Sequence, residues 1–181
     1  MINIGSWQKE CPVSIDDLCY IQVIHHNFNK EDKLGELIVH KSIAIDMIKI
    51  MNELYDINYP IYQMKLISNF NANDWESIEA DNTSSFNCRK ITGGKKWSNH
   101  AYGKAIDINP LENPYISKKG YISHKESIRY KKRIHLNNES FQNKAILLAN
   151  DKATKIFKKY GFKWGGDWKT IKDYQHFEKH P

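Results

Sequence analysis

The sequence predicts a single α+β domain in which a central antiparallel sheet is flanked by helices. Short alternating apolar segments, typical of strands, recur along the chain, and two longer segments place apolar residues at helical spacing. No internal repeat, low-complexity tract or interdomain linker interrupts the 181 residues, a length that fits one domain. We therefore expect residues 1–181 to form one domain.

The first part of the chain predicts a short helical turn, two strands and a long helix. Ser14 can cap a helix start, because acidic residues follow it in the first turn. Residues 20–24 and 35–39 read as strands that the polar segment 27–33 connects. Residues 40–55 place their apolar side chains on one helix face.

The second part of the chain predicts two more strands and another helix. Residues 61–67 read as a strand, and so do residues 104–109, which Pro110 ends. The clearest helical pattern extends from residue 140 to residue 160. Gly161 then provides a C-terminal stop.

The segment between residues 110 and 138 has no clear periodicity. Loops of this length in a compact domain usually have a function. Seven basic residues and one acidic residue fall between Lys118 and Arg133. This stretch is either a solvated surface loop or a basic lip over a groove that receives an anionic polymer.

The overall charge is basic, with a net charge of +6 and a pI near 9.0. Such a charge favours polyanionic surroundings, which include nucleic acid, anionic lipid and an acidic cell wall, and does not choose among them. We expect no nucleic-acid partner, because neither zinc-finger spacing nor an RNA-binding signature is present. The sequence contains no run of 18 apolar residues, so it predicts no membrane span.

The N-terminal sequence has neither the charged nor the apolar region of a secretory signal. Either the protein stays inside the cell, or a signal has been removed. The three cysteines, Cys11, Cys19 and Cys88, leave at least one thiol free, and none belongs to a CxxC pair. A Cys11–Cys19 bridge could form in an oxidising compartment.

Two segments concentrate side chains that can bind a metal. In the first, His100 precedes a turn centred on Gly103, and Asp107 lies inside an alternating strand. A loop followed by a strand can bring this imidazole and this carboxylate to one metal ion. Because burying an isolated charge is costly, a carboxylate in the middle of a strand needs a partner, and a divalent cation is one.

In the second segment, His176 follows Asp173 by three residues. Two histidines, one aspartate and a water molecule make the open tetrahedral site expected of catalytic zinc. Asp173 would then act as the general base toward that water. Taken singly, each of these residues is more often an ordinary surface or core residue, so the spacing needs further support.

The combined motifs supply that support. SxHxxGxAxDI at residues 98–108, WGGDW at 164–168 and DxxHFE at 173–178 resemble a family of zinc peptidases. The family contains D-alanyl-D-alanine carboxypeptidases and L-alanyl-D-glutamate endopeptidases, and it is allied to the vancomycin-resistance D,D-peptidases, phage endolysins and the hedgehog domain. The resemblance covers about residues 61–181 and implies that fold, whereas residues 1–60 match less well and are expected to extend the same domain.

The resemblance also implies roles for individual residues. It makes His100, Asp107 and His176 the ligands of a Zn²⁺ cofactor and Asp173 the catalytic base. It further implies that Arg89 holds the scissile carbonyl and its developing oxyanion, and the alternative for this residue is a surface salt bridge.

Four more residues are candidates for shaping the site. Ser98 is expected to bind substrate or to support the site. Trp164 and Trp168 either wall the substrate cleft or pack in the core. Asp167 could orient a ligand imidazole.

The implied activity is zinc-dependent hydrolysis of D-amino-acid-containing peptides of peptidoglycan, so stem peptides are the expected partners and a monomer the default. The enzyme would be a D,D-carboxypeptidase or an L-Ala-D-Glu endopeptidase, and an aspartate base favours the endopeptidase. The alternative is a non-catalytic zinc-containing recognition module, which the complete catalytic set disfavours. The implied location is the cell envelope or the exterior, or the cytoplasm for a phage-type endolysin.

Overall fold

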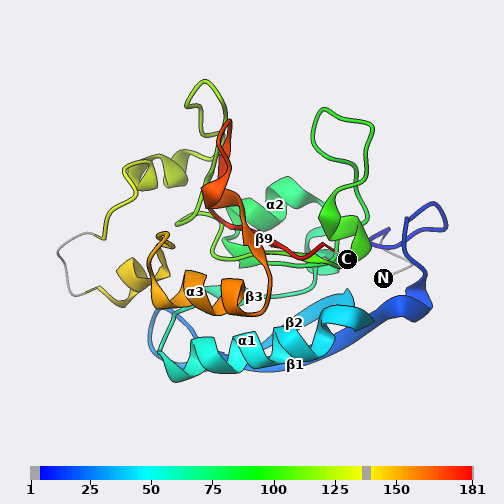
Figure 1. Cartoon of the computed structure of the whole chain (residues 1–181), viewed down its shortest axis with the longest axis horizontal. Helices are drawn as coiled ribbons and strands as arrows, with labels where there is room; N and C mark the ends of the chain where they lie inside the picture. The colour runs from blue at the N-terminus through cyan, green and yellow to red at the C-terminus, as the bar shows by residue number, and fades with distance from the viewer. Residues whose placement is uncertain (1–4, 136–139, 181) are drawn as a thin grey trace.

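The computed structural model describes residues 5–135 and 140–180. Its base is a long hairpin of β1 (Leu18–His26) and β2 (Asp32–His40), with helix α1 (Ala44–Asp56) packed on it (Figure 1). The remaining sheets, helices and loops lie above the hairpin and α1 in this view, and they contact both. The predicted α+β class is confirmed, but the strands of the described residues form four small sheets instead of one central sheet.

The other helices and strands are short, and most of them follow residue 60. They are β3 (Gln63–Met64), α2 (Asp74–Glu79), β4 (Asn82–Thr83), β5 (Ala105–Asp107), β6 (Tyr115–Ile116), α3 (Lys152–Lys159), β7 (Lys163–Trp164), β8 (Lys172–Asp173) and β9 (His176–Glu178). Short 3₁₀ helices connect them, namely η2 (Ile15–Asp17), η3 (Lys41–Ile43), η4 (Ile67–Phe70), η5 (Asn99–Tyr102), η6 (Lys125–Tyr130), η7 (Phe141–Ala145) and η8 (Gly165–Asp167). No helix among the described residues is long and apolar enough to cross a membrane.

The hairpin and α1 form as the sequence predicts. Ser14 caps η2, and β1 pairs with β2 in an antiparallel register that places Leu18 opposite His40. Alternate strand residues turn one face of the hairpin toward α1, whose apolar side is fully buried. Each fully buried side chain of this kind contributes about 1.5–3 kcal/mol relative to an exposed one.

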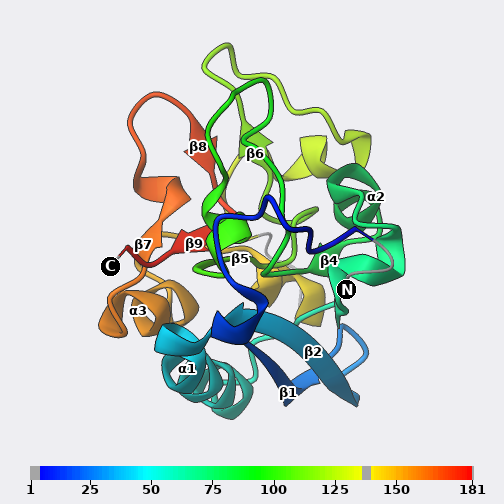
Figure 2. The ribbon, with the colours of Figure 1, turned by 90° about the vertical axis from the view of Figure 1, so that its right-hand side faces the viewer.

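The sheet that matters most for function is the antiparallel set β5-β9-β7 (Figure 2). Asp107 lies opposite His176 in this sheet, and Ile106 lies opposite Phe177. Since successive side chains of a strand point to opposite faces, the polar pair shares one face and the apolar pair the other. Phe177 stacks on Phe157 of α3, and this contact joins the sheet to the same core as the hairpin and α1.

The helix predicted for residues 140–160 is wrong in its first half, because η7 ends at residue 145 and α3 begins only at Lys152. Between η7 and α3 the backbone forms hydrogen bonds with side chains that are distant in the sequence. Leu147 N–H donates to Asn113 Oδ1 at 2.8 Å, and the Leu147 carbonyl accepts from Arg133 at 2.9 Å. Neither group is therefore available for a helical bond.

Other predicted elements are present with adjusted limits. The strand predicted at 61–67 shortens to β3, and the one at 104–109 shortens to β5. Gly161 follows α3 with a φ of 82°, a left-handed conformation that suits glycine, so the predicted helix stop is confirmed.

The segment 110–138 contains β6 and η6, and its positions 136–138 lie outside the described residues. Arg133 does not belong to an exposed basic lip. Its guanidinium donates to the Glu112 carbonyl, to Asn113 Oδ1 and to the Leu147 carbonyl. The basic side chain at this position is therefore a structural donor, and the exposed positive charge of the segment comes from the residues before it.

The Cys11–Cys19 bridge considered from the sequence does not form, because Cys11 forms a disulfide with Cys88 and Cys19 is free. Cys19 pairs with Val39 inside the hairpin. The N-terminal stretch instead packs beside Phe86 in a separate apolar cluster, which brings Cys11 to Cys88. The two bridged cysteines are 77 residues apart, so closeness in the sequence does not predict which cysteines pair.

Candidate metal centre and active site

The three side chains predicted to bind a metal lie together in the interior. Each of His100, Asp107 and His176 offers one ligand atom, and these atoms all lie within 4.8 Å of one another. His100 Nε2 is 3.2 Å from His176 Nδ1 and 3.3 Å from Asp107 Oδ2. His176 Nδ1 is 3.0 Å from Asp107 Oδ1. The cluster therefore presents two imidazole nitrogens and a carboxylate to one point.

The turn that carries His100 has a specific local cause. Ser98 caps η5 by accepting a hydrogen bond from the His100 N–H, and Gly103 ends η5 with a φ of 66°. A Cβ at position 103 would lie 2.6 Å from the His40 backbone nitrogen, so only glycine fits against β2. The predicted turn at Gly103 is confirmed, and it holds His100 against the hairpin.

The outer nitrogens of both imidazoles contact hydrogen-bond acceptors. His100 Nδ1 is 2.6 Å from the Ser85 carbonyl oxygen, and His176 Nε2 is 3.1 Å from Glu178 Oε2. When these nitrogens carry the protons, the inner nitrogens direct lone pairs at the centre of the cluster. This arrangement suits a cation at the centre, and the donor set of two imidazoles and a carboxylate is one that zinc prefers.

The electrostatics of the cluster also favour positive charge. Burial disfavours the charge of Asp107, but the neighbouring His100 and His176 hold its pKa well below the usual range. Burial likewise opposes charge on His176, while hydrogen bonds to Asp107 and Glu178 raise its pKa to about 10. The two imidazoles thus stabilise the negative charge of the buried Asp107 carboxylate, and they are the partners that a charge in the middle of a strand needs.

Glu178 is a residue of the site that the sequence analysis did not single out. Its carboxylate contacts His176 and also accepts a hydrogen bond from the Asn99 side chain. The HFE triplet could have indicated this contact, because in a strand the second residue after His176 points to the same face as His176 itself. Sequence reasoning assigned the orienting role to Asp167 instead.

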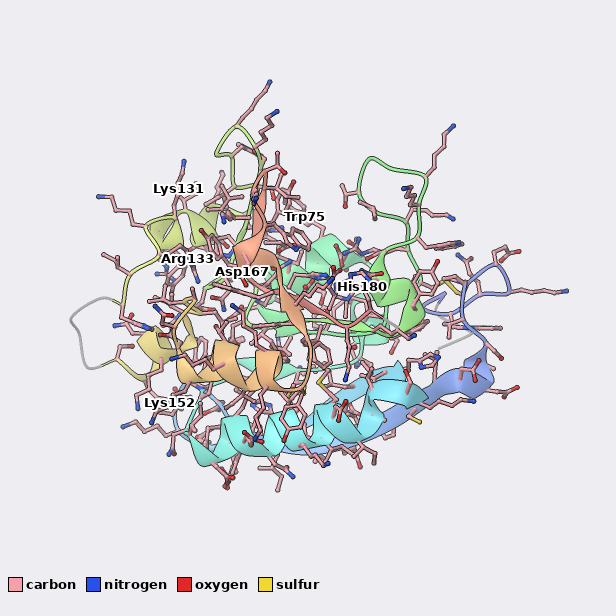
Figure 3. The ribbon with its side chains drawn as sticks, in the orientation of Figure 1. Trp75, Lys131, Arg133, Lys152, Asp167 and His180 are labelled. Atoms are coloured by element: carbon pink, nitrogen blue, oxygen red, sulfur yellow. A yellow bond between two sulfur atoms is a disulfide. The ribbon has the colours of Figure 1, made fainter. Side chains whose placement is uncertain are left out.

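Asp167 does not orient an imidazole. It is exposed and forms an ion pair with Lys158 of α3 at 2.7 Å (Figure 3). Trp164 is 3% exposed and lies in the main hydrophobic core. Of its two predicted roles, core packing is therefore the one realised, and its indole N–H donates to the Tyr174 carbonyl.

Trp168 and Asp173 lie beside the centre. The Trp168 ring is 5.5 Å from the His176 ring between centroids, and this tryptophan is partly exposed. Asp173 Oδ1 is buried and has no hydrogen-bond partner in the described part of the chain. Burial first, and the negative charge of Asp107 second, raise the pKa of Asp173 to about 7.

The two glycines of the WGGDW block allow this close packing. A Cβ on Gly165 would collide with the backbone and side chain of Asp173, and one on Gly166 would collide with the Trp164 indole. The block therefore closes around the strand that carries Asp173. This requirement explains the paired glycines in physical terms.

Arg89 lies at the edge of the same region. Its guanidinium pairs with Asp74 at 2.9 Å, its Nε has no partner among the described residues, and its positive charge lowers the pKa of Asp173. The salt bridge considered for this residue is present. The Arg89 side chain is about one-quarter exposed, with a relative exposure of 26%.

Comparison with protein-family models gives a match to part of the chain. Residues 92–179 match the model of a family described as D-alanyl-D-alanine carboxypeptidase. The matched segment contains the three clustered residues and Asp173, whereas Arg89 and the hairpin precede it. No solved structure matches the chain. The family resemblance predicted from the motifs is confirmed over the matched residues.

Proposed function

From the membership of residues 92–179 in the D-alanyl-D-alanine carboxypeptidase family, we propose that the chain is a zinc-dependent peptidase of bacterial peptidoglycan. At the level of the family, the match supports a carboxypeptidase-like metallopeptidase. The observation that carries the finer proposal is the buried cluster of His100, Asp107 and His176, whose inner nitrogens converge on one point. Its substrates are D-amino-acid-containing stem peptides.

The proposed ligands of Zn²⁺ are His100 Nε2, His176 Nδ1 and a carboxylate oxygen of Asp107. A zinc ion held there would polarise the peptide carbonyl and favour deprotonation of the attacking water. Ser85 and Glu178 fix the two imidazoles from outside, so the ligand geometry is prepared before substrate binds.

Asp173 is the proposed general base. Its carboxylate takes a proton from the attacking water and returns it to the leaving amine. The pKa of about 7 supports this role, because a base with a pKa near the working pH can both accept and release a proton. The unpartnered Oδ1 leaves one carboxylate oxygen uncommitted to other protein groups in the described residues.

The other predicted site residues take supporting roles in this proposal. Arg89 stabilises negative charge on the carbonyl oxygen, and Asp74 fixes its guanidinium. Trp168, next to His176, contacts the substrate. Ser98 acts through its cap on the turn of His100. Trp164 supports the site only from the core.

The bond cleaved and the place of action are also proposals. An aspartate base favours an endopeptidase that cuts between L-Ala and a D-residue over a carboxypeptidase that removes terminal D-Ala. The protein acts as a monomer on the cell wall, either exported to the envelope or made in the cytoplasm as a phage-type endolysin. The second candidate, a non-catalytic zinc module, gives no reason for a buried Asp173 Oδ1 without a hydrogen-bond partner in the described residues.

The test is to incubate the zinc-loaded chain with tripeptide, tetrapeptide and pentapeptide stems and to identify products by mass spectrometry. We expect either release of L-Ala together with a peptide that begins at the following D-residue, or loss of the terminal D-Ala, and no product when a chelator is present. The matched variant Asp173→Asn should keep stoichiometric zinc and lose activity by about 10²–10⁴-fold. Zinc bound without any product in the wild type would instead support the recognition module.

A further inference from the structure

Asn87 has a buried side-chain amide that no other group of the described residues satisfies. The residue is 4% exposed, and its Nδ2 has no hydrogen-bond partner in that part of the chain. Leaving a buried donor without a partner is costly, and the large majority of buried polar atoms in native proteins have one. The Asn87 amide therefore points to a group that the chain itself does not provide.

The backbone places Asn87 beside the turn that carries a proposed metal ligand. Asn87 N–H donates to the His100 carbonyl at 3.3 Å, and Ser98 N–H donates to the Arg89 carbonyl at 3.1 Å. Residues 87–89 therefore lie alongside residues 98–100. The Asn87 carbonyl accepts from Arg89 N–H at 2.9 Å, so both backbone groups of Asn87 are bonded and only its side chain remains for a ligand.

The neighbouring side chains indicate which way the Asn87 amide points. Phe86 and Cys88 belong to the apolar cluster beside the N-terminal stretch, to which Cys88 is also joined by the disulfide. The stretch is not helical and has strand bridges at both ends, so its successive side chains point to roughly opposite sides. Asn87 and Arg89 thus both face away from the cluster. On that side the charge of Arg89 acts on Asp173, so the Asn87 amide shares the side of the proposed base.

The buried atoms left without a partner on this side are chemically complementary to a peptide bond under attack. Asn87 Nδ2 and Arg89 Nε are donors, and Asp173 Oδ1 is an acceptor. Two donors suit a carbonyl oxygen that gains negative charge, and the acceptor suits a proton of the attacking water. The disulfide and the backbone bonds hold residues 87–89 in place, so the donors are oriented before substrate binds.

We propose that Asn87 is a further catalytic residue, whose amide donates a hydrogen bond to the scissile carbonyl oxygen together with Arg89. The proposal deepens the proposed function, on which it rests for the reaction. As water attacks the carbonyl carbon and gives its proton to Asp173, the electron pair of the C=O bond moves to the oxygen that the two donors hold. The pair returns when the C–N bond breaks and the proton passes to the leaving amine.

The variant Asn87→Ala tests this role. We expect kcat on a stem peptide to fall by about 10²–10³-fold, with KM within about threefold of the wild type and zinc still bound stoichiometrically. A phosphinate analogue of the scissile bond, which mimics the charged tetrahedral oxygen, should bind more weakly by a similar factor when measured by calorimetry. The thermal unfolding midpoint should change by no more than about 2 °C, because the side chain makes no hydrogen bond within the described residues.

Asn82→Ala is the matched control. Asn82 is also buried, but its amide bonds to both backbone groups of Lys65 and to Ser77 Oγ. The control should lower the unfolding midpoint by about 4–8 °C and leave kcat of the folded protein within about twofold of the wild type. The two variants thus separate the loss of a substrate contact from the loss of a structural hydrogen bond.

A kcat within about twofold of the wild type in folded Asn87→Ala overturns the proposal. If the alanine variant does not fold, Asn87→Asp keeps the size of the side chain and removes the donor. It should lose at least as much activity, and full activity in this variant overturns the proposal equally. The double variant Asn87→Ala/Arg89→Lys should lose less than the product of the two single losses, because both donors serve one oxygen. Independent losses overturn the shared oxygen.

The same measurements separate this proposal from the proposed function. Cleavage of stem peptides at equal rates by the wild type and by Asn87→Ala keeps the peptidase and rejects the role of Asn87. Absence of cleavage by the wild type, with phosphinate binding that depends on Asn87, rejects the peptidase and keeps the donor. Neither cleavage nor binding that depends on Asn87 rejects both.

Discussion

Replacing Glu178 with glutamine tests the idea that this carboxylate prepares the metal centre. Glu178 Oε2 lies 3.1 Å from His176 Nε2, and the side chain also accepts a hydrogen bond from Asn99. Burial opposes its charge, but the bonds from His176 and Asn99 lower the pKa of Glu178 to about 2. Glu178 is therefore ionised at neutral pH, and when a zinc ion takes the inner nitrogen of His176, this carboxylate accepts the hydrogen bond of the proton that remains on the outer nitrogen.

Glutamine keeps the size of the side chain and can still accept a hydrogen bond, but it has no charge. The amide can also rotate and present its NH₂ group to His176, which favours the wrong tautomer of the imidazole. Loss of such an outer partner typically weakens metal binding by about 10–100-fold, which corresponds to about 1.4–2.7 kcal/mol. We expect Glu178→Gln to fall in this range.

The assay is competition for zinc between the protein and a chromophoric chelator at pH 7. Glu31→Gln is the matched control, because Glu31 is an exposed glutamate in the turn of the hairpin and pairs with Lys33. Circular dichroism and thermal unfolding with excess zinc establish that both variants fold. An affinity of Glu178→Gln within twofold of the wild type would refute the orienting role.

Three further predictions concern stability. The pKa of Asp81 is raised to about 9 by burial and by the neighbouring Glu112. The folded state therefore keeps a proton that the unfolded state releases, and the free energy of unfolding should fall as pH rises from about 4 to about 9. Asp81→Asn should flatten this dependence in urea titrations, and an unchanged slope would contradict it. Cys88→Ser, which removes the disulfide to Cys11, should lower the free energy of unfolding by about 2–4 kcal/mol, and so should reduction of the wild type. Equal denaturation midpoints with and without reductant would show that the bridge contributes nothing. Gly103→Ala should cost about 1–3 kcal/mol, because the left-handed φ of 66° and the contact with β2 both exclude a Cβ, and it should also weaken zinc binding. A variant as stable as the wild type would show that β2 can move aside.

Local sequence patterns predicted the secondary structure correctly where it depends on residues that are close in the sequence. The hairpin and α1 formed as predicted because alternating and helical periodicities each match one buried face. The turn at Gly103 and the stop at Gly161 followed from backbone conformations that glycine adopts without strain. The cluster of His100, Asp107 and His176 was predicted from the motif spacing together with the family resemblance.

Local patterns failed where distant groups compete for the backbone. Residues 140–150 have helical periodicity, but Asn113 and Arg133 bind the backbone of Leu147 and exclude a helix there. The pairing of Cys11 with Cys88, and not with Cys19, depends on where the N-terminal stretch crosses the domain. None of these contacts leaves a signal in neighbouring residues.

The sequence by itself predicted the α+β class, the resemblance to the family and the three residues that cluster in the structure. The tertiary structure alone decided that Glu178 and not Asp167 contacts His176, and that Trp164 belongs to the core. The physical reason is that a motif records which side chains are present along the chain. Which side chains touch across strands and loops is set by the register of β5 with β9 and by the packing of segments far apart in the sequence.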